Sequence, residues 1–169
     1  MTVTSTEDNG AKDMPMSALV LGVGGLVPFV GLPLWQMFTI DEMVRERIVA
    51  AFIFYAASIL SFLGGIGWGL AMRERDPVRR GLAFGVSVTP SLVAWAAAFV
   101  NVQFFAFSLG ALGLAFALQG AWDVQLAGTG RAPRWFAGLR MVLTAVVLLA
   151  IAAMWIWRPP LSATSGFFL

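Results

Sequence analysis

The sequence predicts an all-α fold, a polytopic transmembrane helix bundle with five spans. Hydrophobic residues make up 59% of the chain and charged residues only 12%, whereas a soluble domain carries about 25% charged residues. The apolar residues are also segregated into long runs without charge, a pattern that a soluble core does not need. A chain with this composition and patterning has lipid as its main solvent.

The first two spans follow a short polar tail, residues 1–15. The first span, 16–38, is long enough to cross a hydrocarbon core of about 30 Å, and Pro28 and Pro33 within it predict a kink. A charged stretch, 39–47, follows and predicts an exposed helical turn that Asp41 caps. This turn leads directly into the second span, 48–72.

The third and fourth spans share one uncharged run, residues 81–122, which is too long for a single crossing. Asn101 and Gln103 are the candidates for a turn, so the run predicts a tight hairpin of two spans, 81–100 and 102–122. Pro90 lies midway along the third span. The fifth span, 136–157, completes a membrane domain of residues 16–158, and a short tail, 159–169, follows.

The basic residues predict the orientation of the bundle, because short cytoplasmic loops are enriched in arginine and lysine. With five spans, one side of the membrane carries Lys12, Arg73, Arg75, Arg79, Arg80, Arg131, Arg134 and Arg140. The other side carries only Arg45, Arg47 and Arg158. The sequence therefore predicts a cytoplasmic N-terminus and a periplasmic C-terminus.

Composition also excludes several classes of chemistry. The chain has no cysteine and no histidine, which excludes disulfides, thiolate zinc sites and histidine-ligated haem, and leaves no histidine for general acid or base catalysis. No constellation of serine, lysine and carboxylate resembles a hydrolase or transferase site. We therefore predict no catalytic site, no cofactor and no metal. The arginines flank hydrophobic runs, which does not favour nucleic-acid binding.

Charged side chains inside a membrane are functional candidates by default. Asp123 and Arg140 lie near the same interface, at the facing ends of the fourth and fifth spans. One interpretation is a proton or anion site, and the other is a structural ion pair or two side chains that reach the interface separately. The structural interpretation is the one we favour.

Small residues recur at every fourth position of the second span, at Ala57, Ser61, Gly65 and Gly69, and so share one helix face. Such a face is used most often for close helix packing in lipid, so we interpret it as an internal seam of the bundle. The alternative is a groove for a small apolar ligand, such as a quinone or a lipid. That hypothesis assigns the following residues to a binding site: Tyr55, Ser61, Gly65, Trp68, Gly69 and Pro90.

Several segments resemble a known family. The run from Tyr55 to Gly65 followed by Trp68-Gly69 is the strongest, and weaker ones are Met14-Pro15, Val27-Pro28-Phe29, Pro90-Ser91-Leu92 with Trp95, and Pro133-Arg134-Trp135-Phe136 with Leu139-Arg140. Together they resemble the uncharacterised membrane family that includes mitochondrial transmembrane protein 69 and proteobacterial proteins. The resemblance implies a multi-span protein of bacterial inner membranes or mitochondria and carries over no activity. Without a transit peptide pattern, the bacterial inner membrane is favoured.

Three functional hypotheses follow. The first is a non-enzymatic accessory subunit or assembly factor of a larger membrane complex, whose partners are the lipid bilayer and other membrane-protein subunits. The second is a binding or transport module for a small apolar ligand. The third, an intramembrane enzyme, would require Asp123 and Arg140 to meet in a pocket that water can enter.

Overall fold

The computed structural model describes residues 14–100 and 104–157 of the chain. These residues form six α-helices and no strand. The first two helices together make one crossing, so the described part of the chain contains five spans that are long and apolar enough to cross a membrane. The predicted all-helical bundle with five spans is confirmed. The predicted turn at Asn101 and Gln103 lies outside the described residues.

The first span is broken into two helices, α1 (Met16–Gly24) and α2 (Val27–Phe38). Pro28 lies at the start of α2 and has no N–H to donate to the carbonyl of the preceding turn, so the helix is interrupted where a kink was predicted. The Tyr55 hydroxyl donates a hydrogen bond of 2.8 Å to the Gly25 carbonyl oxygen at this break. In lipid, a free backbone carbonyl needs such a partner.

Helix α3 (Glu42–Ala71) packs against α2, α4 and α5 and supplies much of the core. Its first turn is held by the Asp41 side chain, which accepts hydrogen bonds from the amides of Met43 and Val44. An acidic cap satisfies free N–H groups and complements the helix dipole. The helix therefore begins in the charged stretch, before the predicted start of the span at residue 48.

Helix α4 (Pro77–Val100) runs antiparallel to α3. Asp76 precedes it and accepts a hydrogen bond of 2.8 Å from the Arg79 amide, while Pro77 occupies the first helical position. The two helices approach closely at Gly64 and Gly67 of α3, which lie against Ser87 of α4. Small residues at a crossing allow this approach in lipid.

Helices α5 (Phe105–Gly128) and α6 (Arg134–Ile156) form the last hairpin. Gly130 follows α5 with a φ of 73°, a conformation that glycine adopts without strain. The Arg131 amide then donates back to the Leu126 carbonyl, which closes the end of α5. This tight closure brings α6 directly back along α5.

Apolar side chains are found both inside and outside the bundle. The core contains residues such as Phe52, Leu60, Leu112, Phe116 and Met154, all essentially inaccessible. Large apolar side chains also cover the outer surface along every helix. A soluble monomer rarely exposes apolar patches of this extent, so the outer surface is suited to contact with lipid.

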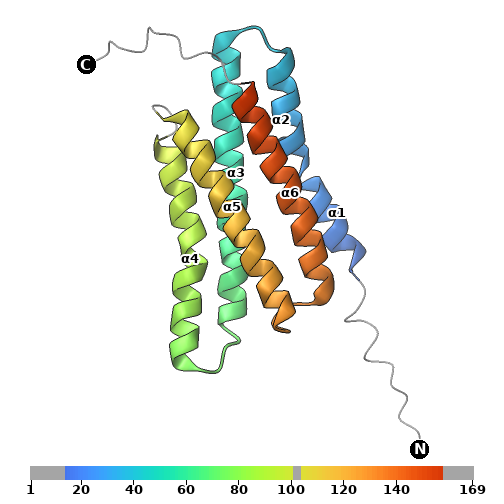
Figure 1. The fold of residues 1–169 in the computed structure, drawn as a ribbon, viewed down its shortest axis with the longest axis vertical. Coiled ribbons are helices and arrows are strands. Elements are labelled where there is room, and N and C mark those ends of the chain that lie inside the picture. Colours follow the sequence, from blue (N-terminus) through green and yellow to red (C-terminus); the bar gives the residue numbers. More distant parts are fainter. Residues whose placement is uncertain (1–13, 101–103, 158–169) are drawn as a thin grey trace, which may run out of the picture.

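The two ends of the bundle differ in charge. One end, here called the basic end, contains the start of α1, the α3–α4 loop and the α5–α6 loop (Figure 1). Its described arginines outside the helix interiors are Arg73, Arg75, Arg79, Arg80, Arg131 and Arg134. The opposite end contains the α2–α3 connection and the end of α6, with Arg45 and Arg47 nearby.

Candidate functional site

A buried polar layer joins α5 to α6 within the bundle, and consists of Gln119, Asp123, Arg140 and Thr144. The Arg140 Nε lies 2.6 Å from the Asp123 Oδ2, in an ion pair with side chains only 8% and 5% exposed. The Gln119 amide donates a hydrogen bond of 3.0 Å to the other carboxylate oxygen. The structure thus brings together the two charged residues that the sequence placed at facing helix ends.

Helix periodicity explains the layer. Residues 119 and 123 are four apart on α5, residues 140 and 144 are four apart on α6, and residues at this spacing share a face. Gly120 lets the two faces meet, because a Cβ atom there would lie 2.8 Å from the Thr144 hydroxyl oxygen. A side chain at position 120 would separate the two helices.

Two atoms of the polar layer have no hydrogen-bond partner among the described residues, the Arg140 Nη2 and the Thr144 Oγ1. The layer pairs one carboxylate with one guanidinium, so it offers no second acid for proton exchange. Neither Asp123 nor Arg140 lines either of the two cavities described below. This geometry suits a pair that holds two helices in register, since a buried charge requires a partner.

Gln36 is a second buried polar residue, and the sequence did not single it out as part of a site. Its side chain is fully buried on α2, and its Nε2 donates a hydrogen bond of 3.0 Å to the Trp157 carbonyl oxygen. This contact ties the end of α2 to the end of α6. The Gln36 Oε1 has no partner among the described residues.

None of the six residues assigned to an apolar ligand site lines either of the two cavities described below. Tyr55 faces the α1–α2 break, and Pro90 is buried beside Gly64. Trp68 packs on Phe84 of α4, with ring centroids 4.5 Å apart. The remaining members of the set are on another side of α3, where Ser61 is half-buried and Gly65 and Gly69 are exposed.

The close seam between α3 and α4 therefore differs from the predicted one. It runs through Gly64 and Gly67, whereas Gly65 and Gly69 have nothing within 4 Å of the position of a Cβ atom. The interpretation of Gly65 and Gly69 as part of an internal seam is wrong, because they face outward from the bundle.

Two exposed stripes of small residues remain on the outer surface. The exposed small residues of α3, here called the α3 small-residue face, are Ala51, Ser58, Gly65 and Gly69, and the exposed rings of Phe54 and Phe62 lie between them on the same side. The α4 small-residue face consists of Gly81, Gly85 and Thr89. Positions seven or four apart lie on one side of a helix. In both stripes the glycines have open space above them.

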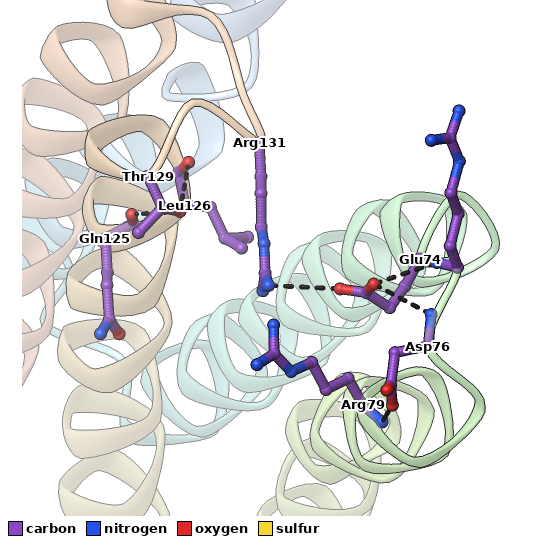
Figure 2. Close-up of polar contacts among 8 residues, drawn as sticks. Glu74, Asp76, Arg79, Gln125, Leu126, Thr129 and Arg131 are labelled. Carbon is purple, nitrogen blue, oxygen red and sulfur yellow. Dashed lines mark hydrogen bonds and ion pairs between the residues drawn. The ribbon is translucent and has the colours of Figure 1, made fainter.

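A cavity of about 470 Å³ opens at the basic end between α3, α4 and α5. Arginines from two loops, Arg73, Arg75 and Arg131, lie on its rim, and apolar residues form its walls. Figure 2 shows Arg131 reaching from the α5–α6 loop to Glu74 of the α3–α4 loop, where the ion pair measures 3.2 Å. In the sequence these arginines indicate orientation only, because nothing there shows that the two loops meet.

A second groove of about 360 Å³, with almost no polar atoms in its walls, lies between α5 and α6 towards the opposite end. Leu109, Gly113, Ile151 and Trp155 are among the residues that line it. The two glycines in this stretch of α5, Gly110 and Gly113, make the groove wide. The sequence contains only a weak signal for this groove, because glycines occur in most of the spans.

Comparison with known proteins agrees with the fold. A family model described as a protein of unknown function (DUF3429) matches residues 14–156. Transmembrane protein 69 of Xenopus tropicalis is 37% identical over 142 residues, which cover 83% of this chain and 54% of that protein. Transmembrane protein 69 of Mus musculus is 32% identical over 142 residues, 82% of this chain and 55% of that protein.

The chain thus spans about half the length of these curated relatives. No solved structure matches it. The family match extends from just before α1 to the end of α6, and so covers all five spans. The chain therefore belongs to the DUF3429 family of uncharacterised membrane proteins, and over more than four fifths of its length it is similar to transmembrane protein 69 of the two species above.

Proposed function

We propose that this membrane protein is a non-enzymatic accessory subunit or assembly factor of a larger complex in the bacterial inner membrane. The observation that carries the proposal is the pair of exposed small-residue faces on α3 and α4. The packing needs of the bundle are met elsewhere, at Gly64, Gly67 and Gly120. The outward glycines are therefore available for helices of other subunits.

Helix association in lipid depends on close packing, because lipid tails are as apolar as the side chains of a helix. A leucine-covered face has little preference for another helix over lipid, whereas a glycine stripe lets a partner backbone approach closely. Gly81, Gly85 and Thr89 follow the four-residue spacing of such contacts on α4. The spacing favours a partner helix over lipid at this face.

The polar chemistry supports a role without catalysis. No group of three or more acidic side chains that would hold a metal occurs in the part of the chain that the structure describes. Asp123 is closed off by Arg140 and Gln119. A hydrolytic or proton-transfer site needs reactive groups within reach of substrate, and this layer is buried between two helices.

A second candidate function is the binding of a small apolar ligand such as a quinone or a lipid. The apolar groove between α5 and α6 favours it, because its walls carry almost no polar atoms and Trp155 lies at one end. An aromatic ring beside an apolar groove is a frequent feature of small-molecule sites. The groove lies on other helices than the six residues that the sequence assigned to such a site.

The test is purification of the tagged protein from native membranes in mild detergent, followed by mass spectrometry of proteins and extracted lipids. We expect a stoichiometric complex that is lost in Gly65→Leu and Gly85→Leu. The matched control is Gly31→Leu, since Gly31 is also exposed with nothing above it but belongs to neither face. Recovery of the unaltered protein alone would overturn the proposal, and a bound quinone would favour the second candidate.

A further inference from the structure

The basic-end cavity lies where α4 and α5 diverge. Figure 1 shows these helices close together at the opposite end and apart at the basic end, with α3 between them in this view. Small residues on α3 and α4, including Gly67, Ala71 and Ala83, leave the space open, and Trp122 and Leu126 form the α5 wall. The volume of about 470 Å³ falls within the range of small-molecule sites.

The rim of this cavity is positively charged. Arg73, Arg75 and Arg131 line it together with a single acid, Glu74. Arg73 and Arg75 form no ion pair with any residue in the described ranges, 14–100 and 104–157. Figure 2 shows Arg79 of α4 directed to the same side of the loop as Arg131. Two of the three rim arginines, Arg73 and Arg75, therefore have no carboxylate partner among the described residues.

Glu74 offsets the charge of only one of the three rim arginines. One of its oxygens lies 3.2 Å from Arg131, and the other accepts hydrogen bonds from the backbone amides of Arg75 and Asp76. The carboxylate is thus used to shape the α3–α4 loop and to join it to the α5–α6 loop. Arg73 and Arg75 remain available for an anion at the mouth of the cavity.

The walls indicate what kind of anion fits. Below the arginines, the cavity is bounded by apolar side chains of membrane-spanning helices, among them Leu70, Trp122 and Leu126. Loop arginines can set membrane orientation without any cavity beneath them. A cavity that is basic at its mouth and apolar along its walls matches an amphiphile, and guanidinium groups bind phosphate oxygens with paired hydrogen bonds.

We propose that the basic-end cavity binds an anionic membrane phospholipid. Arg73 and Arg75 hold its phosphate, Arg131 keeps its ion pair with Glu74 at the rim, and the upper part of an acyl chain lies against Trp122 and Leu126. Basic pockets between transmembrane helices recognise such headgroups. The site is separate from both small-residue faces and from the α5–α6 groove, so it does not depend on the function proposed above.

The experiment is native mass spectrometry of the full-length protein in neutral detergent, titrated with short-chain phosphatidylglycerol. Phosphatidylcholine and inorganic phosphate are titrated in parallel. We expect tighter binding of phosphatidylglycerol than of phosphatidylcholine, with no displacement by phosphate. Arg73→Gln with Arg75→Gln should weaken phosphatidylglycerol binding by about tenfold or more.

Two controls separate a defined site from general charge. Arg45→Gln with Arg47→Gln removes the same charge at the opposite end and should leave the affinity unchanged. Ala83→Phe fills the cavity without changing charge, and should abolish binding. Any one of four results would overturn the proposal. These are equal affinity for the two lipids, displacement of the lipid by inorganic phosphate, an equal loss of affinity in the Arg45 and Arg47 variant, and retained binding in folded Ala83→Phe. If a variant fails to fold, the comparison of phosphatidylglycerol with phosphatidylcholine on the unaltered protein still tests the proposal.

Discussion

The carbonyl oxygen of Ser87 lies 2.5 Å from the position that a Cβ atom at Gly64 would occupy. No side chain fits at that distance without a shift of the α4 backbone. The contact sets how closely α3 and α4 approach, and Gly67 extends it one turn further along α3. This pair of helices therefore depends on glycine at a specific position.

Gly64→Ala should destabilise the protein by about 1–3 kcal/mol, the usual cost of an added methyl group in a closely packed site. The adjacent Gly65→Ala is the control, because nothing lies within 4 Å of its Cβ position. Alanine there should be neutral or slightly stabilising, since it is a better helix former than glycine. The measurement is thermal unfolding of both variants in the same detergent, and equal melting temperatures would contradict the assignment of the seam.

The sequence could predict the five spans but not which glycines form the seam. Charge-free runs and proline positions are local features of the sequence. Their composition alone shows that the long apolar runs require lipid as their solvent. The glycines at 64, 65, 67 and 69 occupy both sides of one helix, so each side satisfies a small-residue pattern. Only the position of Ser87 on α4 decides between the two sides, and that contact depends on tertiary packing.

Removing only one member of the buried pair of Asp123 and Arg140 should strongly lower the stability of the protein. Asp123→Ala leaves a buried guanidinium without its partner, which typically costs about 3–5 kcal/mol. Replacing both residues with apolar side chains, as Asp123→Leu with Arg140→Met, removes both charges and should restore much of the stability. Chemical unfolding of Asp123→Leu, Arg140→Met and the double variant that combines them forms a double-mutant cycle.

Glu74→Gln is the control for this cycle. The Glu74–Arg131 pair is 22% and 49% exposed, so its loss should cost at most about 1 kcal/mol. A double variant at 123 and 140 that is less stable than either single variant would show that the pair does more for the polar layer than neutralise each other's charge. In that case Gln119 and Thr144 would depend on the pair for their own placement.

Only part of the candidate site could be predicted from the sequence, because the rest depends on tertiary packing. Asp123 and Arg140 flank one short loop, so their proximity follows from chain connectivity. Arg73, Arg75 and Arg131 come from two loops separated by the whole α4–α5 hairpin. Their meeting around one cavity depends on the divergence of α4 from α5, which no local pattern in the sequence specifies.

Tyr55→Phe should weaken the break in the first span. The substitution removes the hydrogen bond to the Gly25 carbonyl and leaves that oxygen without its partner from α3, at a cost of about 1 kcal/mol. Amides around the α1–α2 break should then exchange with solvent deuterium faster than in the unaltered protein, as measured by mass spectrometry. Ser58→Ala is the control, because that exposed hydroxyl bonds only to Phe54 of its own helix. Unchanged exchange in Tyr55→Phe would show that the bond does not hold the break.

The orientation can be tested with single cysteines, because the chain has none of its own. Ile40 lies at the α2–α3 connection and is 97% exposed, and Thr129 lies at the basic end. If arginine-rich loops stay in the cytoplasm, a membrane-impermeant maleimide should label Ile40→Cys in bacterial cells whose outer membrane has been opened. Thr129→Cys should react only after the inner membrane is permeabilised. The reverse pattern would place the basic end in the periplasm and would contradict the orientation inferred from the arginines. Because the two positions lie at opposite ends of one bundle, labelling of both before permeabilisation would mean a mixed population of orientations.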